Sequence, residues 1–122
     1  RLVLCSGKVY YDLIDARKQN PIDSIAIMRI EQLYPFPIDE YQKELEKYPQ
    51  LKTLVWCQEE PQNQGAWYQS RHNFVSNIQP EIDIIYCGRP ASASPAVGNL
   101  AKHIKQQQAV IESALYGTST TV

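Results

Sequence analysis

Glu59 and Glu60 are adjacent carboxylates that directly follow an apolar run, Thr53 to Gln58. Two carboxylates at the end of one strand could serve as general acid and general base if their surroundings separated their pKa values. Successive strand residues point to opposite faces of a sheet, however, so we do not expect both side chains to reach one substrate. We therefore predict a structural or interface role for this pair. The same interpretation applies to Glu31 and Gln32, which follow another apolar run.

Lys8 and Arg89 are basic residues that could hold a phosphate or a carboxylate at such strand ends. Ser6-Gly7-Lys8 lies between an apolar run and a helical pattern, so we expect Ser6 to cap that helix. A helix N-terminus beside Lys8 could also bind an anion. A single glycine is far short of a phosphate-loop pattern, and capping is therefore the preferred interpretation. For Arg89 we favour an ion pair with one of the two glutamates over contact with a ligand phosphate.

The segment from Arg89 to Pro95 contains two prolines and two serines, Ser92 and Ser94. Ser94-Pro95 is typical of a helix start, with serine as the cap and proline at the first helical position. We expect a stiff loop here that presents Arg89.

His72 and His103 each stand alone in a helical pattern. Neither has a second histidine or a carboxylate at metal-ligand spacing, or a serine or cysteine placed as a nucleophile, so we expect surface or packing roles. The three cysteines each lie inside an apolar run, and none belongs to a Cys-x-x-Cys pair. They are predicted to be buried structural thiols in a reducing compartment, which is either the cytoplasm or an equivalent reducing matrix. The cysteines are Cys5, Cys57 and Cys87.

Four short apolar runs that alternate with helical patterns indicate the elements that position these residues. Alternation of this kind predicts an α/β fold, with a mostly parallel sheet covered by helices on both faces. The loops that follow parallel strands meet at one edge of the sheet, where such folds bind ligands and partners. The expected strands are Leu2 to Cys5, Ile25 to Ile30, Thr53 to Gln58 and Ile82 to Cys87; the expected helices are Lys8 to Gln19, Ile38 to Tyr48, Ala66 to Ser76 and Ala96 to Leu115. We predict one domain over residues 1–116 and a polar tail over 117–122.

Charge and hydropathy exclude two classes of partner. The net charge of −1 provides no basic field for nucleic acid. No apolar run approaches the ~18 residues that cross a membrane, and the N-terminus has no secretory signal pattern. The chain starts at Arg1, directly before a strand-like run, and we expect it to be a piece of a longer protein.

Four segments together resemble the C-terminal domain of the first, decarboxylating component of 2-oxoglutarate dehydrogenase, in its bacterial form. They read CSGKVYYDL from Cys5, RIEQLYPFP from Arg29, VWCQEEPQNQGAW from Val55 and GRPASASPAVG from Gly88. The resemblance extends from Arg1 to about Leu115 and implies a three-layer, transketolase C-terminal-like domain with a sheet of about five strands, one of them antiparallel at an edge. Related thiamine-diphosphate enzymes, namely transketolase and the pyruvate and branched-chain dehydrogenases, and a free-standing α/β binding module are the alternatives.

In that family the whole enzyme uses thiamine diphosphate and magnesium, and it passes a succinyl group to the lipoyl arm of the dihydrolipoyl succinyltransferase component. The resemblance implies that other domains bind the cofactors, so we expect no catalytic, cofactor or metal site in this chain. Its expected partners are the preceding domains of the same chain and a second subunit of a homodimer. Some family members respond to AMP or acetyl-CoA, and basic residues at the loop edge would suit the phosphates of such an effector. The candidate effector or interface residues are Lys8, Arg29, Gln32, Glu59, Glu60, Asn63, Gln64, Arg89, Ser92 and Ser94.

Overall fold

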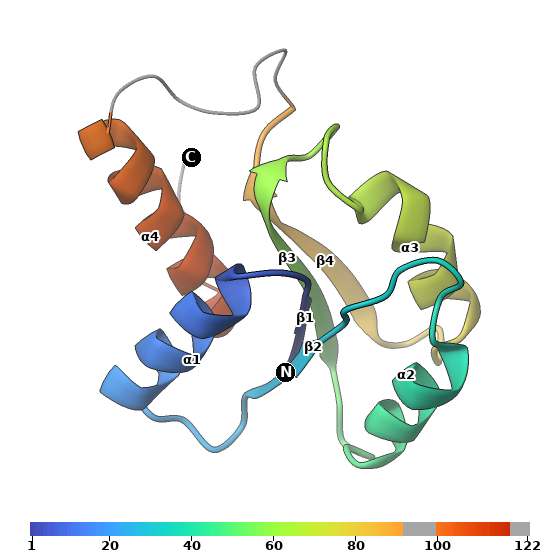
Figure 1. Ribbon diagram of the computed structural model, residues 1–122. Coiled ribbons are helices and arrows are strands. Elements are labelled where there is room, and N and C mark those ends of the chain that lie inside the picture. The colour runs from blue at the N-terminus through green and yellow to red at the C-terminus, as the bar shows by residue number, and fades with distance from the viewer. Residues whose placement is uncertain (92–99, 118–122) are drawn as a thin grey trace.

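The computed structural model describes residues 1–91 and 100–117 as alternating strands and helices (Figure 1). Four parallel strands form one sheet in the order β2-β1-β3-β4. The elements are β1 Leu2–Cys5, α1 Val9–Gln19, β2 Ala26–Arg29, α2 Ile38–Glu46, β3 Thr53–Pro61, α3 Trp67–Ser76, β4 Asp83–Arg89 and α4 Leu100–Tyr116. The predicted α/β class and parallel sheet are confirmed. Within the described ranges the sheet has one strand fewer than the resemblance implies.

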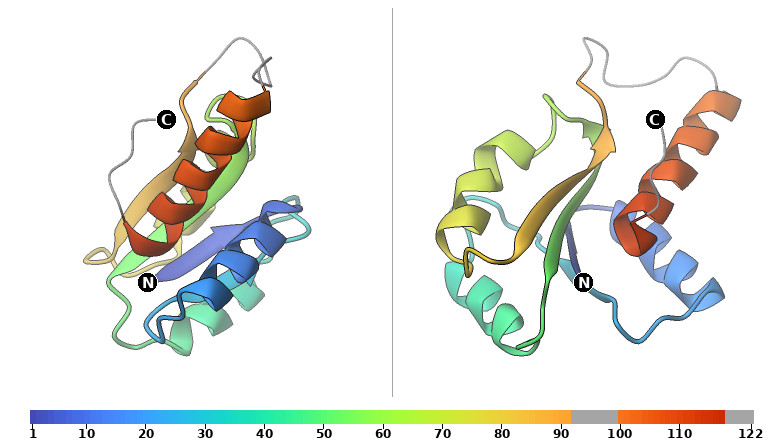
Figure 2. Two further views of the ribbon diagram at one scale, coloured as in Figure 1. Left: turned by 90° about the vertical axis from the view of Figure 1, so that its left-hand side faces the viewer. Right: turned by 180° about the vertical axis from the view of Figure 1, so that it is seen from behind.

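The helices form two layers, one on each face of the sheet (Figures 1 and 2). Helices α1 and α4 cover one face, and α2 and α3 cover the other. This arrangement follows from the strand order, because the chain moves from β1 to β2 in one direction and returns past β1 to β3, and right-handed crossovers in opposite directions place their helices on opposite faces. The direction changes between β1 and β3, which is the topological switch point of the sheet.

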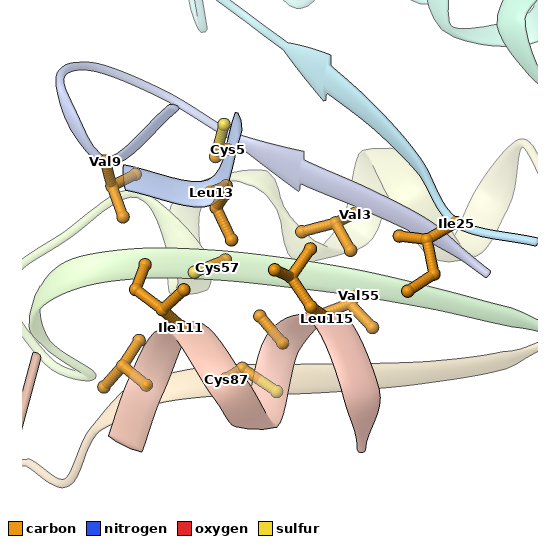
Figure 3. Packing of buried hydrophobic residues seen from close by; sticks show 12 residues of the cluster. Val3, Cys5, Val9, Leu13, Ile25, Val55, Cys57, Cys87, Ile111 and Leu115 are labelled. Atoms are coloured by element: carbon orange, nitrogen blue, oxygen red, sulfur yellow. The ribbon is translucent and has the colours of Figure 1, made fainter. Parts of the chain in front are cut away.

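The sheet is buried on both faces, which explains why its strands are continuous apolar runs. All four residues of β1 are inaccessible to solvent. Val3 and Cys5 face α1 and α4, where Leu13 and Leu115 pack against them (Figure 3). The other residues of β1 belong to a second cluster that includes Trp56, Tyr41 and Phe74. Full burial of one such side chain stabilises the fold by roughly 1.5–3 kcal/mol.

The three cysteines occupy one row across the sheet, as Figure 3 shows. Cys5 pairs in register with Cys57, and Cys57 pairs with Cys87. All three are free and buried, as predicted. Burial raises the pKa of Cys5 to about 12 and the pKa of Cys57 well above its ordinary value. At neutral pH these groups are therefore protonated thiols that serve as core side chains.

Candidate functional site

The loops after β1, β2 and β3 meet at the carboxyl end of the sheet, together with the last residues of β4 (Figure 1). The sequence-based expectation of a shared edge is therefore confirmed for the part of the chain that is described. Ser92 and Ser94, with the predicted helix start at Ser94-Pro95, fall in residues 92–99 and lie outside it. We call this edge the rim.

A hydrogen-bonded network around Gln107 joins four elements at the rim. The Gln107 side-chain Nε2 donates to Glu59 Oε1 at 3.1 Å and to Asp12 Oδ2 at 3.3 Å. Its Oε1 accepts from Arg89 Nη2, also at 3.1 Å. Lys8 Nζ lies 3.4 Å from the same Glu59 oxygen, at the switch point between β1 and β3. One amide side chain of α4 thus ties α1, β3 and β4 together.

Arg89 does not form the direct ion pair with Glu59 or Glu60 that we predicted from the sequence. Its Nη2 contacts Gln107 Oε1 and His103 Nδ1, both at 3.1 Å. Because a guanidinium only donates, the contact with His103 requires an unprotonated Nδ1. The expected pair is wrong because α4 packs over this side of the rim and inserts Gln107 between the arginine and Glu59. Arg89 is also buried as the last residue of β4, rather than presented on a loop.

Glu59 and Glu60 point to opposite sides of the sheet, as the strand pattern predicts. Glu59 lines a groove of about 560 Å³ between α1 and α4, which we call the α1/α4 groove. Glu60 lines a separate hollow of about 360 Å³ beside the start of α3, together with Ser6 and Gln64. The two carboxylates therefore cannot act on one substrate as acid and base.

Arg29 and Gln32 make contacts within their own neighbourhood. The Arg29 guanidinium lies over the rings of Tyr10 and Tyr11, at 5.4 and 5.1 Å from their centroids, and Nη1 donates to the Tyr11 hydroxyl at 3.1 Å. Its Nε forms an ion pair with Glu31. Gln32 Nε2 donates to the Tyr34 carbonyl at 3.3 Å. Arg29 therefore has different partners from Lys8 and Arg89, and the three cations do not form one cluster.

Ser6 does not cap α1, contrary to the prediction. The helix begins at Val9, the residue before it is Lys8, and none of the described side chains caps it. Gly7 adopts a positive φ of 81°, and its carbonyl accepts the Tyr10 N–H at 3.3 Å. This turn places two residues between Ser6 and the first helical residue, which removes the hydroxyl from the capping position.

Gln58 is a buried polar residue of the rim that the sequence reasoning did not single out. Its Oε1 accepts from Trp56 Nε1 at 2.8 Å and from the Trp67 backbone N–H at 3.3 Å. Its Nε2 donates to the Pro61 carbonyl at 2.9 Å. A Cβ added at Gly65 would lie 2.5 Å from the Gln58 side chain, so this position has no room for a larger residue. Its position as the last residue of the predicted strand Thr53 to Gln58 was the available signal.

The rim aromatics divide into buried and exposed residues. Trp67 is buried at the start of α3, and Phe36 packs edge-on against Phe74 at 5.5 Å. Tyr34 is 93% exposed and Tyr68 is 57% exposed. Asn63 and Gln64 are exposed in the loop between β3 and α3. Trp67 and Tyr68 belong to α3, within the helix predicted from Ala66 to Ser76.

Neither a metal-ligand cluster nor a membrane-spanning helix occurs among the described residues. Across residues 1–91 and 100–117, no three or more histidine, cysteine, aspartate or glutamate side chains are grouped so as to hold a metal ion. In the same ranges, none of the helices has the length and apolar character of a membrane span.

Known proteins resemble this chain over nearly its whole length. A family model described as 2-oxoglutarate dehydrogenase C-terminal matches residues 1–115. The 2-oxoglutarate dehydrogenase E1 component of Haemophilus influenzae is 57% identical over 115 residues, and that of Cupriavidus necator is 53% identical over 114 residues. The mitochondrial 2-oxoglutarate dehydrogenase of Dictyostelium discoideum is 46% identical over 120 residues.

Each matched region covers nearly all of this chain but only a small part of the relative. They cover 94%, 93% and 96% of this chain, respectively, but only 12% of each of these three relatives. The chain therefore spans about an eighth of the length of these relatives. With the family model matched over residues 1–115, the chain belongs to the 2-oxoglutarate dehydrogenase C-terminal family.

Proposed function

We propose that this chain is the C-terminal, non-catalytic domain of a 2-oxoglutarate dehydrogenase E1 subunit, formed by residues 1–116 with a polar tail at 117–122. The supporting observation is an identity of 46–57% to E1 proteins over nearly the whole chain. The complete subunit decarboxylates 2-oxoglutarate oxidatively and transfers the succinyl group to the lipoyl arm of dihydrolipoyl succinyltransferase. The bacterial relatives and the three free cysteines support a bacterial cytoplasmic location.

Thiamine diphosphate and magnesium are bound elsewhere in the subunit under this proposal. Magnesium prefers carboxylate and carbonyl oxygens together with phosphate oxygens in octahedral geometry. The described rim does not fit that requirement, because Glu59 is bonded to Lys8 and Gln107 and Glu60 faces the opposite side of the sheet. No step of the reaction is therefore assigned to residues of this chain.

The contribution of the chain is to dock its rim against the preceding domains and the second subunit of the homodimer. Support comes from exposed Tyr34 and Tyr68 beside the exposed polar residues Gln32, Asn63 and Gln64. Aromatic residues are enriched at the centres of protein interfaces. The internal network of Gln107 holds the rim in one shape before contact, which lowers the entropy cost of association.

A turnover assay tests the non-catalytic role. The complete E1 polypeptide is expected to reduce ferricyanide in the presence of 2-oxoglutarate, thiamine diphosphate and magnesium, whereas the 122-residue chain gives no rate above background. Turnover by the chain alone would refute the non-catalytic role. Failure of the complete polypeptide with 2-oxoglutarate, together with activity on another 2-oxo acid, would refute the assigned substrate.

Effector binding is the second candidate function, favoured by one observation. Lys8 has 82% of its side chain exposed at the rim, where it could contact a phosphate of AMP or acetyl-CoA. Calorimetry on the complete enzyme would compare Lys8→Ala and Arg89→Ala with the wild type. Unchanged affinity in both variants would reject the effector site in favour of the interface.

A further inference from the structure

The α1/α4 groove is lined by one side of each of two neighbouring helices. Helix α1 contributes Asp12, Asp15, Ala16 and Gln19, which share one side of the helix because they lie three or four residues apart. Helix α4 contributes a similar series from His103 to Glu112. Figure 1 shows the two helices on the same face of the sheet. The groove therefore follows the helices and is open to a segment of polypeptide rather than closed around a small molecule.

The lining of the groove is anionic. Among the described lining residues the carboxylates are Asp12, Asp15, Glu59 and Glu112, and Lys8 is the one lysine or arginine, so four negative charges and one positive charge give −3 with a neutral histidine. The whole chain carries a net charge of −1. Asp15 and Glu112 are exposed, and neither forms an ion pair with another described residue. The groove is therefore complementary to a cationic partner.

Apolar side chains line the same groove as these carboxylates. Ile104 of α4 is 49% exposed and lines the groove. Ala16 and Ile111 line the same groove. An occupant that also carries an aliphatic residue would remove this surface from water. The groove therefore fits a partner that carries both positive charge and an aliphatic side chain.

The upper end of the groove is continuous with the rim. Lys8, Glu59 and His103 line the groove, and the same residues belong to or contact the Gln107 network. A segment that docks on the rim can therefore extend between the helices without crossing another surface. Most of an E1 subunit lies outside the matched region, since the relatives are about eight times longer than the segment they share with this chain.

We propose that the α1/α4 groove receives a lysine-bearing segment, with an aliphatic residue beside its lysines, from the part of the E1 subunit outside these 122 residues. The proposal rests on the proposed function, because it requires that this chain is joined to a larger E1 polypeptide. Asp15 and Glu112 face the lysine ammonium groups, and Ile104 contacts the aliphatic residue.

Carbodiimide cross-linking of the complete E1 enzyme tests the identity of the occupant. The reagent joins a carboxylate to a lysine amine as an amide with loss of water, and only when the two groups touch. Mass spectrometry is expected to find links from Asp15 or Glu112 to a lysine outside residues 1–122. Links only to lysines within residues 1–122, which would include those of a second copy, or no link at all, would overturn the proposal.

Charge reversal gives a second readout. The double variant Asp15→Lys/Glu112→Lys is compared with Glu46→Lys/Glu81→Lys, which reverses two exposed carboxylates outside the groove. We expect the groove variant to lower the thermal midpoint of the complete enzyme by at least about 2 °C. Added salt should reduce the difference because it screens exposed charges. Equal midpoints for the two double variants would contradict the proposal.

Both readouts are independent of turnover. A complete enzyme that lacks activity with 2-oxoglutarate but gives the expected links would count against the proposed function and leave the groove partner intact. An active enzyme without these links would leave the proposed function intact and reject the groove partner.

Discussion

The side-chain amide of Gln107 lies 3.1 Å from the carboxylate of Glu59, and the two residues are 48 positions apart in the chain. This bond fixes α4 against the end of β3. It also places the Gln107 carbonyl oxygen where Arg89 can donate to it, so the amide of Gln107 bridges the buried guanidinium and the Glu59 carboxylate. The shape of the rim therefore depends on one uncharged side chain from α4.

Gln107→Leu is expected to destabilise the chain by about 1–3 kcal/mol, because it removes the acceptor of a buried guanidinium and a donor to Glu59. Gln108→Leu is the matched control, since Gln108 is the neighbouring glutamine of α4 and is exposed. Urea denaturation measures both variants. Equal losses in the free energy of unfolding would show that the Gln107 bonds contribute nothing beyond helix packing.

Gly65→Ala is expected to cost about 1–3 kcal/mol, because the new Cβ would overlap a side chain that is held in place. That side chain is Gln58, which lies 2.5 Å from the position the added methyl group would occupy and is bonded to Trp56, Trp67 and the Pro61 carbonyl. A double-mutant cycle separates the effect of the contact with Gln58 from an effect on the backbone of residue 65.

In a Gln58→Ala background the obstacle is absent, so Gly65→Ala should cost less than it does in the wild type. The free energy of unfolding from thermal or urea denaturation is the measurement. An undiminished cost in that background would assign the effect to the backbone of residue 65 and reject the contact with Gln58.

The local sequence pattern predicted the helices and strands better than it predicted the contacts between them. The runs at Leu2 to Cys5 and Thr53 to Gln58 predicted buried parallel strands, because burial on both faces requires apolar residues at every position. β3 continues to Pro61, since a register irregularity after Cys57 allows a polar segment to stay paired with β4. A proline and two glutamates gave no strand signal there.

The rim contacts could be predicted only in part. Parallel strands place their following loops at one edge, so the approximate location of Lys8 and Glu59 followed from the strand pattern. The partner of Arg89 did not, because it depends on how α4 packs over the sheet and which of its glutamines faces inward. Gln107 has no local feature that distinguishes it from Gln106 or Gln108.

Because the thiols are buried, we predict that the folded chain loses stability at alkaline pH. Burial raises the pKa of Cys5 from 9.0 to about 12. Above pH 9 the thiol ionises in the unfolded chain but keeps its proton in the folded chain, so the unfolded state binds fewer protons and the free energy of unfolding falls as pH rises. This contribution is complete below pH 9 and is lost progressively between about pH 9 and 12.

Cys5→Ala removes that titration, and the decline of the unfolding free energy between pH 9 and 11 should become shallower than in the wild type. Urea denaturation at several pH values measures the slope. Buried tyrosines such as Tyr41, whose pKa is also raised by burial, leave a residual slope in both proteins. Identical slopes would mean that Cys5 titrates alike in the folded and unfolded chains.

Tyr34→Ser should affect the complete E1 enzyme and leave the 122-residue chain nearly unchanged. The Tyr34 side chain is 93% exposed in the chain, so its removal costs little there, whereas an interface residue buried against a neighbouring domain would cost more than about 1 kcal/mol. Ile22→Ser is the matched control, because Ile22 is an exposed apolar residue before β2, at the opposite edge of the sheet from the rim. Thermal unfolding of both variants in both contexts provides the comparison. The rim is a docking surface only if Tyr34→Ser lowers the midpoint of the complete enzyme more than Ile22→Ser does; similar shifts would place the neighbouring domains elsewhere.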